Sequence, residues 1–184
     1  ANDYATSSIR AWLNDDFYNT AFSSSQKASI LTSELGNRAY STSYSEYDSE
    51  TTYDKVFLLS DSEMQNTAYG FPANSDPSSA RRAKGKDDEK CQGLWVDSSN
   101  KCSDQRLRSA GDDSESTCNI DNNGRLVIQM WSTSDTEYGI RPAIKISNLS
   151  SAISKSGGSG SSSGNSNKTT TAKPAGGSNV VTDA

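Results

Sequence analysis

Three cysteines are the most reactive side chains in this sequence, and their spacing favours structural roles. Cys91, Cys102 and Cys118 form an odd set, so at least one thiol is unpaired or pairs elsewhere. Cys91 and Cys102 enclose a short polar loop, which favours a loop disulfide, with free thiols as the alternative. Because the chain has no histidine and no C-x-x-C spacing, we expect no metal site, no cofactor and no His-activated nucleophile.

A second motif has the residue types of a calcium loop. The run Asn119-x-Asp121-x-Asn123-Gly124 copies the first half of such a loop, but Met130 stands where the twelfth position requires Glu. Asn-Gly before alternating apolar residues is also a strong signal for a hairpin turn. We therefore predict a hairpin here and no bound metal.

Aromatic residues in the second half of the chain lie among Asp, Ser and Asn. Rings beside small, adaptable polar side chains are typical of recognition surfaces, and the same mixture suits sugars. The alternative interpretation is that the rings are core residues and the polar residues belong to loops. The residues that we predict to contact a ligand are Trp95, Asp97, Asp112, Asp113, Trp131, Asp135 and Tyr138.

The composition excludes several classes of partner. The 184 residues carry a net charge of −5, which argues against nucleic acid as the main partner. No apolar run is long enough to cross a bilayer, so we expect no membrane insertion. Only 32% of the residues are hydrophobic, and Ser, Thr, Asn and Tyr are abundant. This composition favours an extracellular or cell-surface location.

The last part of the chain differs sharply from the rest. All aromatic residues precede Gly139, and residues 154–184 are rich in Ser, Gly and Thr. Such a segment buries too little apolar surface to offset its chain entropy. We predict a folded domain over residues 1–153 and a disordered linker or tail over residues 154–184.

The elements that position these side chains begin with helices. Apolar residues recur at helical spacing from Ile9 to Phe17, behind a Thr6 or Ser7 cap. The run 23–26 is a capping box that opens a second helix reaching Ile30, and residues 36–54 are typical of an irregular excursion.

Strands follow these helices. The apolar run 55–59 predicts a buried strand, and the next four residues form another capping box that opens a short helix. Residues 70–92 indicate a long surface loop whose opposed charges solvate each other. Alternation after the Asn-Gly turn predicts a strand over 126–131. Residues 138–146 form the last strand, with Pro142 at an edge or a bulge. The layout predicts an α+β fold with antiparallel strands and long loops.

Four motifs in this order resemble a family of uncharacterised bacterial domains. SSIRAWLNDDFYNTAF resembles its S-x-x-R-x-W-L-N-x-x-F-x-x-x-A-F opening, and DKVFLLSDSE resembles its D-x-V-F-L-L-S-x-x-E step. RLRSAG and YGIRPAIKI resemble its W-W-L-R-S-P-G segment and its closing G-V-R-P-A strand. Members of this family are parts of secreted or surface proteins, beside repeats, stalks or pilin-like segments.

The later motifs are also similar to the C-type-lectin-like fold. That fold is shared by formylglycine-generating enzymes and by the variable proteins of diversity-generating retroelements. The resemblance implies a C-type-lectin-like domain. The cysteines here do not match the copper-binding motif of those enzymes, so we expect no enzyme activity.

The chain departs from the family pattern at two places. Gln105 and Arg106 stand where the family usually has a Trp pair. The sequence also starts close to the first motif, where members normally have preceding strands. Either those strands are absent, or they belong to a part of the protein outside this sequence; a domain without them would have an unpaired sheet edge, which could recruit another chain.

Two arginines lie within the later motifs. Arg108 and Arg141 could capture a ligand carboxylate, but we favour structural ion pairs for both, because scaffold motifs usually report packing. We assign a structural role to Cys91 and Cys102 as well.

These observations lead to a main hypothesis and an alternative. The main hypothesis is a non-enzymatic bacterial recognition or adhesion domain that binds a protein or glycan ligand on another cell or surface. The alternative is a structural subunit of a surface filament or pilus, in which neighbouring chains complete the sheets by self-assembly.

Overall fold

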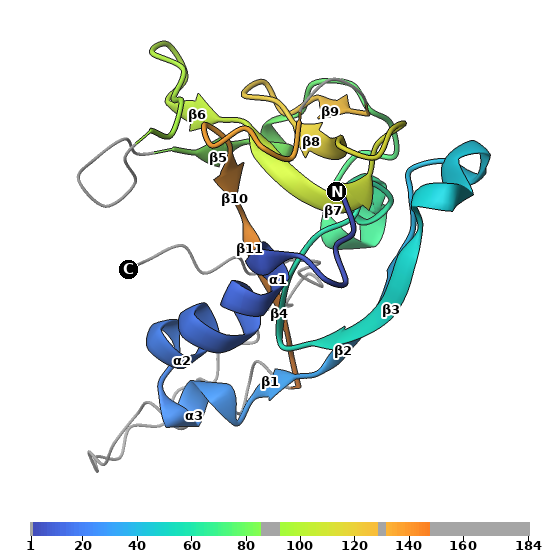
Figure 1. The fold of residues 1–184 in the computed structure, drawn as a ribbon. Coiled ribbons are helices and arrows are strands. Elements are labelled where there is room, and N and C mark those ends of the chain that lie inside the picture. Colours follow the sequence, from blue (N-terminus) through green and yellow to red (C-terminus); the bar gives the residue numbers. More distant parts are fainter. Residues whose placement is uncertain (1, 86–92, 129–131, 148–184) are drawn as a thin grey trace, which may run out of the picture.

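The computed structural model of the chain describes residues 2–85, 93–128 and 132–147 (Figure 1). Its first elements are short helical segments: α1 (Ser8–Trp12), a π-helical turn (Leu13–Phe17), α2 (Tyr18–Ala21) and α3 (Ser24–Lys27). Segments of 3-10 helix lie at Thr42–Tyr47, Glu63–Gln65, Thr67–Tyr69 and Ser79–Arg81.

The described strands are short and belong to four small sheets. Their bounds are β1 (Ile30–Leu31), β2 (Ser33–Asn37), β3 (Ser49–Asp54), β4 (Val56–Leu58), β5 (Ala83–Lys84), β6 (Cys102–Ser103), β7 (Gln105–Ala110), β8 (Thr117–Ile120), β9 (Leu126–Val127), β10 (Gly139–Ile140) and β11 (Pro142–Ile146). The sheets have the orders β1-β11-β4, β10-β7-β8-β9, β2-β3 and β5-β6. The pairs are antiparallel except β10 with β7, which is parallel. The predicted α+β class is confirmed.

The first helical segment begins where the sequence predicts it. Ser7 is the N-cap of α1, and its side chain accepts a hydrogen bond from the Arg10 amide at 3.3 Å. Leu13 is completely buried, whereas Trp12 stays 40% exposed. The side chain of Asn14 forms the hydrogen bonds that a neighbouring strand would form with Val56. Its Oδ1 accepts from the Val56 amide at 3.2 Å, and its Nδ2 donates to the Val56 carbonyl at 2.8 Å. The motif therefore docks the helices onto β4.

The second helix is shorter than predicted. The capping box between Ser23 and Gln26 is present, with both reciprocal hydrogen bonds. The helix ends at Lys27, and Ile30 lies in β1 instead, where it pairs with Ile146. Pairing with the last strand outweighs helix propagation, because a four-residue helix is itself marginal.

The sequence predicts an irregular excursion over residues 36–54, but the structure has paired strands there. They include the end of β2 and all of β3, which pair in antiparallel register from Ser33 opposite Asp54 to Asn37 opposite Ser49. Figure 1 shows this pair as a curved arm at the side of the molecule. Arg10 anchors its base through Asp54, with Nη2 and Oδ1 2.8 Å apart.

The apolar run before the first long loop forms a buried strand as predicted. Val56, Phe57 and Leu58 in β4 are all buried, and they pack with Leu13 and Ile120 in a single core. β4 pairs with β11, so the core lies between the helices, the three-stranded sheet and the β7–β8 pair. The capping box at Ser60 and Glu63 also forms, but it opens only one 3-10 turn.

The loop after residue 70 is not a simple solvated loop. Arg81 is fully buried, and its guanidinium donates to the backbone oxygens of Gly124 at 2.9 Å, Met64 at 3.1 Å and Pro72 at 3.1 Å, and to that of Asp76. The prediction that its charge is solvated was wrong, because this arginine gathers several loops around itself.

The last predicted strand is divided between two sheets. β10 pairs with β7, and after Arg141 the chain enters β11, the central strand of the three-stranded sheet. Pro142 is the first residue of β11 and pairs with Leu58 of β4 on one side, whereas β1 pairs with β11 only further along, at Lys145 and Ile146. Among the described strands Pro142 therefore lies at a locally unpaired edge, as predicted, where the missing N–H is tolerated.

Candidate binding cleft

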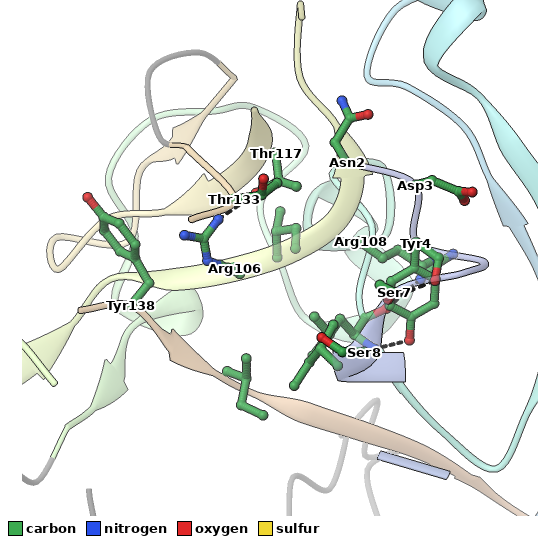
Figure 2. A pocket seen from close by; sticks show the side chains of 14 residues that line it. Asn2, Asp3, Tyr4, Ser7, Ser8, Arg106, Arg108, Thr117, Thr133 and Tyr138 are labelled. Carbon is green, nitrogen blue, oxygen red and sulfur yellow. Dashed lines mark hydrogen bonds between the residues drawn. The ribbon is translucent and has the colours of Figure 1, made fainter. Parts of the chain in front are cut away.

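A cleft of about 360 Å³ lies between the start of the chain and the sheet that contains β7 (Figure 2). The segment from Asn2 to Ile9 forms one wall. The other wall is built from β7, from the neighbouring β8 and from the segment that leads into β10. Leu58, Leu107 and Ile140 contribute apolar surface, and most of the other lining residues are polar or charged.

Arg106 is half-buried in this cleft and connects β7 to the segment before β10. Its Nη2 donates to the backbone oxygens of Ser132 at 2.6 Å and Asp135 at 2.7 Å, and its Nη1 donates to Oγ1 of Thr117 at 3.3 Å. Its guanidinium carbon lies 5.1 Å from the centroid of the Tyr138 ring. Burial lowers the pKa of Arg106, because the charge is partly removed from water.

Backbone hydrogen bonds hold the segment before β10 along the sheet. The Thr133 amide donates to the Glu115 carbonyl at 2.6 Å, and Ser132 forms a bridge with Ser116. At the other end of the segment, the Trp95 amide donates to the Glu137 carbonyl at 3.0 Å. Tyr138 is consequently fixed at one end of the cleft.

Tyr138, Ser8 and Thr133 are among the uncharged polar residues that line the cleft. Burial, followed by the nearby carboxylates of Asp135 and Asp104, raises the pKa of Tyr138 to about 12, so the ring is a neutral phenol at physiological pH. The side chains of Ser8 and Thr133 form no hydrogen bond with any described residue. Their hydroxyls are therefore available to a ligand.

Arg108 lies two positions further along β7 and is held by a carboxylate. Its Nη1 is 2.5 Å from Oε2 of Glu63 and donates to the Leu58 carbonyl at 2.8 Å. Its neighbour Ser109 donates to Oδ1 of Asp61 at 2.8 Å. These bonds join the two motifs F-L-L-S-x-x-E and L-R-S, so the ion pair behind the cleft is structural.

Of the predicted contact residues, Tyr138 lines the cleft, and Trp95 and Asp135 are joined to its surroundings by backbone hydrogen bonds. Trp95 is 45% exposed and bonds to the residue before Tyr138, and the backbone of Asp135 accepts a bond from Arg106. Asp97 is near in sequence but organises its own turn, because its Oδ1 accepts from the amides of Ser99 and Asn100 at 2.8 and 2.9 Å.

Asp112 and Asp113 lie beyond the opposite end of β7. The Asp113 carbonyl accepts a bond of 2.6 Å from the Asn2 side chain, and its carboxylate accepts from the Glu115 amide at 2.7 Å. Asp112 lies 3.5 Å from Oγ of Ser116. The predicted contact residues thus lie near two different ends of β7. At a rise of roughly 3.3 Å per residue, these ends are about 20 Å apart.

The remaining predicted residues have separate surroundings. Trp131 and Cys91 lie outside the described residues. Arg141 is partly buried, and among the described residues its Nη1 has no hydrogen-bond partner. Burial lowers the pKa of this guanidinium. The expected ion pair of Arg141 is therefore not formed with any part of the chain that the structure describes.

Two of the cysteines carry free, buried thiols. Cys102 Sγ donates to the Asn100 carbonyl at 3.5 Å, so the structure has no disulfide at this residue. Cys118 Sγ donates to the Ala110 carbonyl at 3.6 Å, and burial strongly raises its pKa. Both thiols pack inside the domain, where the raised pKa makes Cys118 a poor nucleophile.

The calcium-like motif forms the predicted hairpin. β8 pairs with β9, and Oδ1 of Asp121 accepts from the amides of Asn123 at 2.9 Å and Arg125 at 2.8 Å. Gly124 has φ +79°, and a Cβ there would overlap the Ser78 carbonyl. Within residues 2–85, 93–128 and 132–147, no three His, Cys, Asp or Glu side chains are grouped to bind a metal ion.

Arg106 is the cleft residue that the sequence analysis did not assign to a site. The available signal was its position, since it stands where the resembling family usually has Trp. The neighbouring Gln105 is fully buried and donates to the Arg81 carbonyl at 3.1 Å. Of the two residues that stand in place of the Trp pair, Gln105 therefore lies in the interior and Arg106 lies in the cleft.

Comparison with protein families gives one decisive match. A family described as a domain of unknown function, DUF6273, matches residues 1–148. The chain belongs to the DUF6273 family. Comparisons with curated proteins and with solved structures give no match. The DUF6273 domain therefore spans the helices, all the sheets and the cleft. Among its described residues, no helix has the length and apolar character needed to cross a bilayer.

Proposed function

We propose that this DUF6273 domain is a non-enzymatic extracellular recognition module of a bacterial surface protein, which binds a protein or glycan ligand. The observation that carries the proposal is a cleft lined by Tyr138 and several hydroxyl groups, with Trp95 held close by through the bond from its amide to the Glu137 carbonyl. Trp95 is 45% exposed, so its ring can be reached from solvent. An accessible ring beside a cleft can supply contact area for a ligand.

The surroundings of these rings support binding rather than catalysis. The thiol of Cys118 is buried, Cys102 is buried as well, and neither lines the cleft. The polar groups of the cleft are hydroxyls, an amide, the phenols of Tyr4 and Tyr138, two guanidinium groups and the Asp3 carboxylate. This carboxylate accepts bonds from the Ala5 amide and the Thr6 hydroxyl. These groups can orient a polar ligand by hydrogen bonds, while the rings supply contact area.

A binding screen with matched aromatic variants tests the proposal. The labelled domain is applied to a printed array of animal, plant and bacterial glycans and to a panel of extracellular-matrix proteins. For any target bound by the wild-type domain, we expect Trp95→Ala and Tyr138→Ala each to weaken binding about tenfold or more, because anchoring rings dominate contact energy.

Tyr53→Ala is the matched control. Tyr53 is 64% exposed on the β2–β3 arm and is not a cleft residue, so its removal should leave binding unchanged. Circular dichroism establishes that each variant is folded. The proposal is wrong if the two cleft variants bind like the wild-type domain, or if no glycan or protein in the screen is bound.

A further inference from the structure

The charge of Arg106 distinguishes the cleft from an ordinary polar surface. Its three hydrogen bonds are all to neutral oxygens, and it forms no ion pair with a described residue. Arg10 and Arg108 are each paired with a carboxylate. The fully buried Arg81, like Arg106, donates to neutral backbone oxygens, but Arg81 is enclosed by loops whereas Arg106 lines the cleft. A guanidinium group has five N–H donors, and two of those of Arg106 form no hydrogen bond with a described residue.

The surfaces around Arg106 match a sugar ring better than a hydrocarbon. Figure 2 shows the guanidinium between Tyr138 and the threonine pair Thr117 and Thr133, while Ser8 lies on the opposite wall. Sugar rings offer apolar C–H faces for a phenol ring and hydroxyls for hydrogen bonds. The cleft volume of about 360 Å³ lies at the lower end of the range of roughly 300–1,000 Å³ for ligand pockets. It is therefore suited to a short saccharide.

The sheet beside the cleft disfavours an extended peptide as the ligand. Peptides that bind along a sheet commonly pair with an exposed strand edge. β7 pairs with β8 on one side and, at Gln105 and Arg106, with β10 on the other. Further along, the Arg108 amide donates to the Leu59 carbonyl and the Ala110 carbonyl accepts from the Tyr40 amide, so little of its backbone is left for a peptide. A compact ligand that uses side-chain donors fits this arrangement.

We propose that the cleft binds an acidic sugar residue of a glycan, with the sugar carboxylate at Arg106 and the ring beside Tyr138. The proposal rests on the recognition function proposed above and specifies its ligand class. Within a partly desolvated cleft, a carboxylate would replace the water lost by the guanidinium and form charge-assisted hydrogen bonds.

Matched pairs of saccharides test the charge requirement directly. Trigalacturonate is compared with its methyl ester, and sialyllactose with lactose, by isothermal titration calorimetry at low and high salt. We expect at least one acid to bind about tenfold or more tightly than its uncharged counterpart, with a preference that declines as salt screens the charge. This comparison uses the wild-type domain and does not depend on the folding of a variant.

Two arginine variants then locate the carboxylate. Arg106→Gln should abolish the preference for the acid, whereas Arg106→Lys should retain part of it. Arg125→Gln is the matched control, since Arg125 is an exposed arginine in the β8–β9 turn and does not line the cleft. It should leave binding unchanged.

Several outcomes would overturn the inference. Equal affinity for acid and ester, binding of neither acid, or an undiminished preference in Arg106→Gln would each do so. Equal binding of a Glu-rich peptide would identify an acidic protein segment as the ligand instead. If another target still depends on Trp95 and Tyr138, only the acidic-sugar inference fails and the recognition function stands.

Discussion

Arg106 and Arg108 are two residues apart on β7, yet they have opposite surroundings. Arg108 is 5% exposed and paired with Glu63, inside a network that joins β4 to β7. Arg106 is half-buried at the cleft and bonds only to neutral oxygens of described residues. Two arginines on one strand therefore serve different purposes, one to hold the scaffold together and the other to form a surface.

The difference follows the family motifs. Arg10, Asp54, Glu63 and Arg108 all belong to the segments by which the sequence resembles the family, and all of them form ion pairs inside the scaffold. Arg106 stands where the sequence departs from that pattern. The comparison suggests that the motifs describe the shared scaffold, while the departures describe the surface of this particular domain.

The largest effect should come from removing the scaffold arginine. Arg108→Met leaves the Glu63 carboxylate without its partner and the Leu58 carbonyl without its donor, so we expect the free energy of unfolding to fall by about 3 kcal/mol. Urea denaturation followed by fluorescence measures this change. A loss below about 1 kcal/mol would mean that this ion pair does not hold β4 and β7 together.

The cleft arginine should matter much less for stability. Arg106→Met removes three hydrogen bonds at the surface, and we expect a loss of about 1 kcal/mol or less. The segment that it holds should open more often, so the amides of Thr133 and Trp95 should exchange their hydrogens faster than in the wild-type domain. Hydrogen-exchange NMR tests this, and unchanged exchange would show that backbone contacts alone fix the segment.

The smallest effect should be a pH dependence within the scaffold network. Burial raises the pKa of Asp61. This effect is larger than the opposite effect of the hydrogen bond from Ser109, which lowers the pKa. Between the unfolded value of about 3.9 and the raised native value, the folded state binds more protons than the unfolded chain. The contribution of Asp61 to stability is therefore present at low pH and is lost as pH rises through the native pKa.

Asp61→Asn removes this titration and isolates its effect. We expect the unfolding free energy of the wild-type domain, relative to that of Asp61→Asn, to decrease as pH rises through the window. Urea unfolding of both proteins at several pH values measures the difference. A constant difference across the window would show that the carboxyl titrates alike in both states.

Local features of the fold could be predicted well from the sequence. The Ser7 cap, the capping box at Ser23, the buried strand at Val56 and the hairpin at Asn123 all formed, because each depends on hydrogen bonds or periodicity within a few residues. The prediction for residues 36–54 was wrong, since the polar inner face of the β2–β3 arm lacks the apolar alternation by which strands are identified.

The candidate site was only partly predictable. Tyr138, which was singled out by residue type, lines the cleft and Trp95 is joined to it through the backbone, whereas Asp112 and Asp113 lie beyond the other end of β7. That these residues contact a ligand stays a prediction. The role of Arg106 depends on Ser132 and Asp135, which are more than 25 residues away in the chain. No local pattern indicates such a contact.

By itself, the sequence determined the helix caps, the buried strand, the hairpin and the hydroxyl-rich, acidic character of this domain. Only the tertiary structure decided which arginine meets a carboxylate and which one faces the cleft. The reason is that capping and periodicity are encoded by near neighbours, whereas charge pairing depends on which strands meet. Arg108 meets Glu63 because β7 packs against the end of β4, and Arg106 meets neutral carbonyls because the segment before β10 crosses above it.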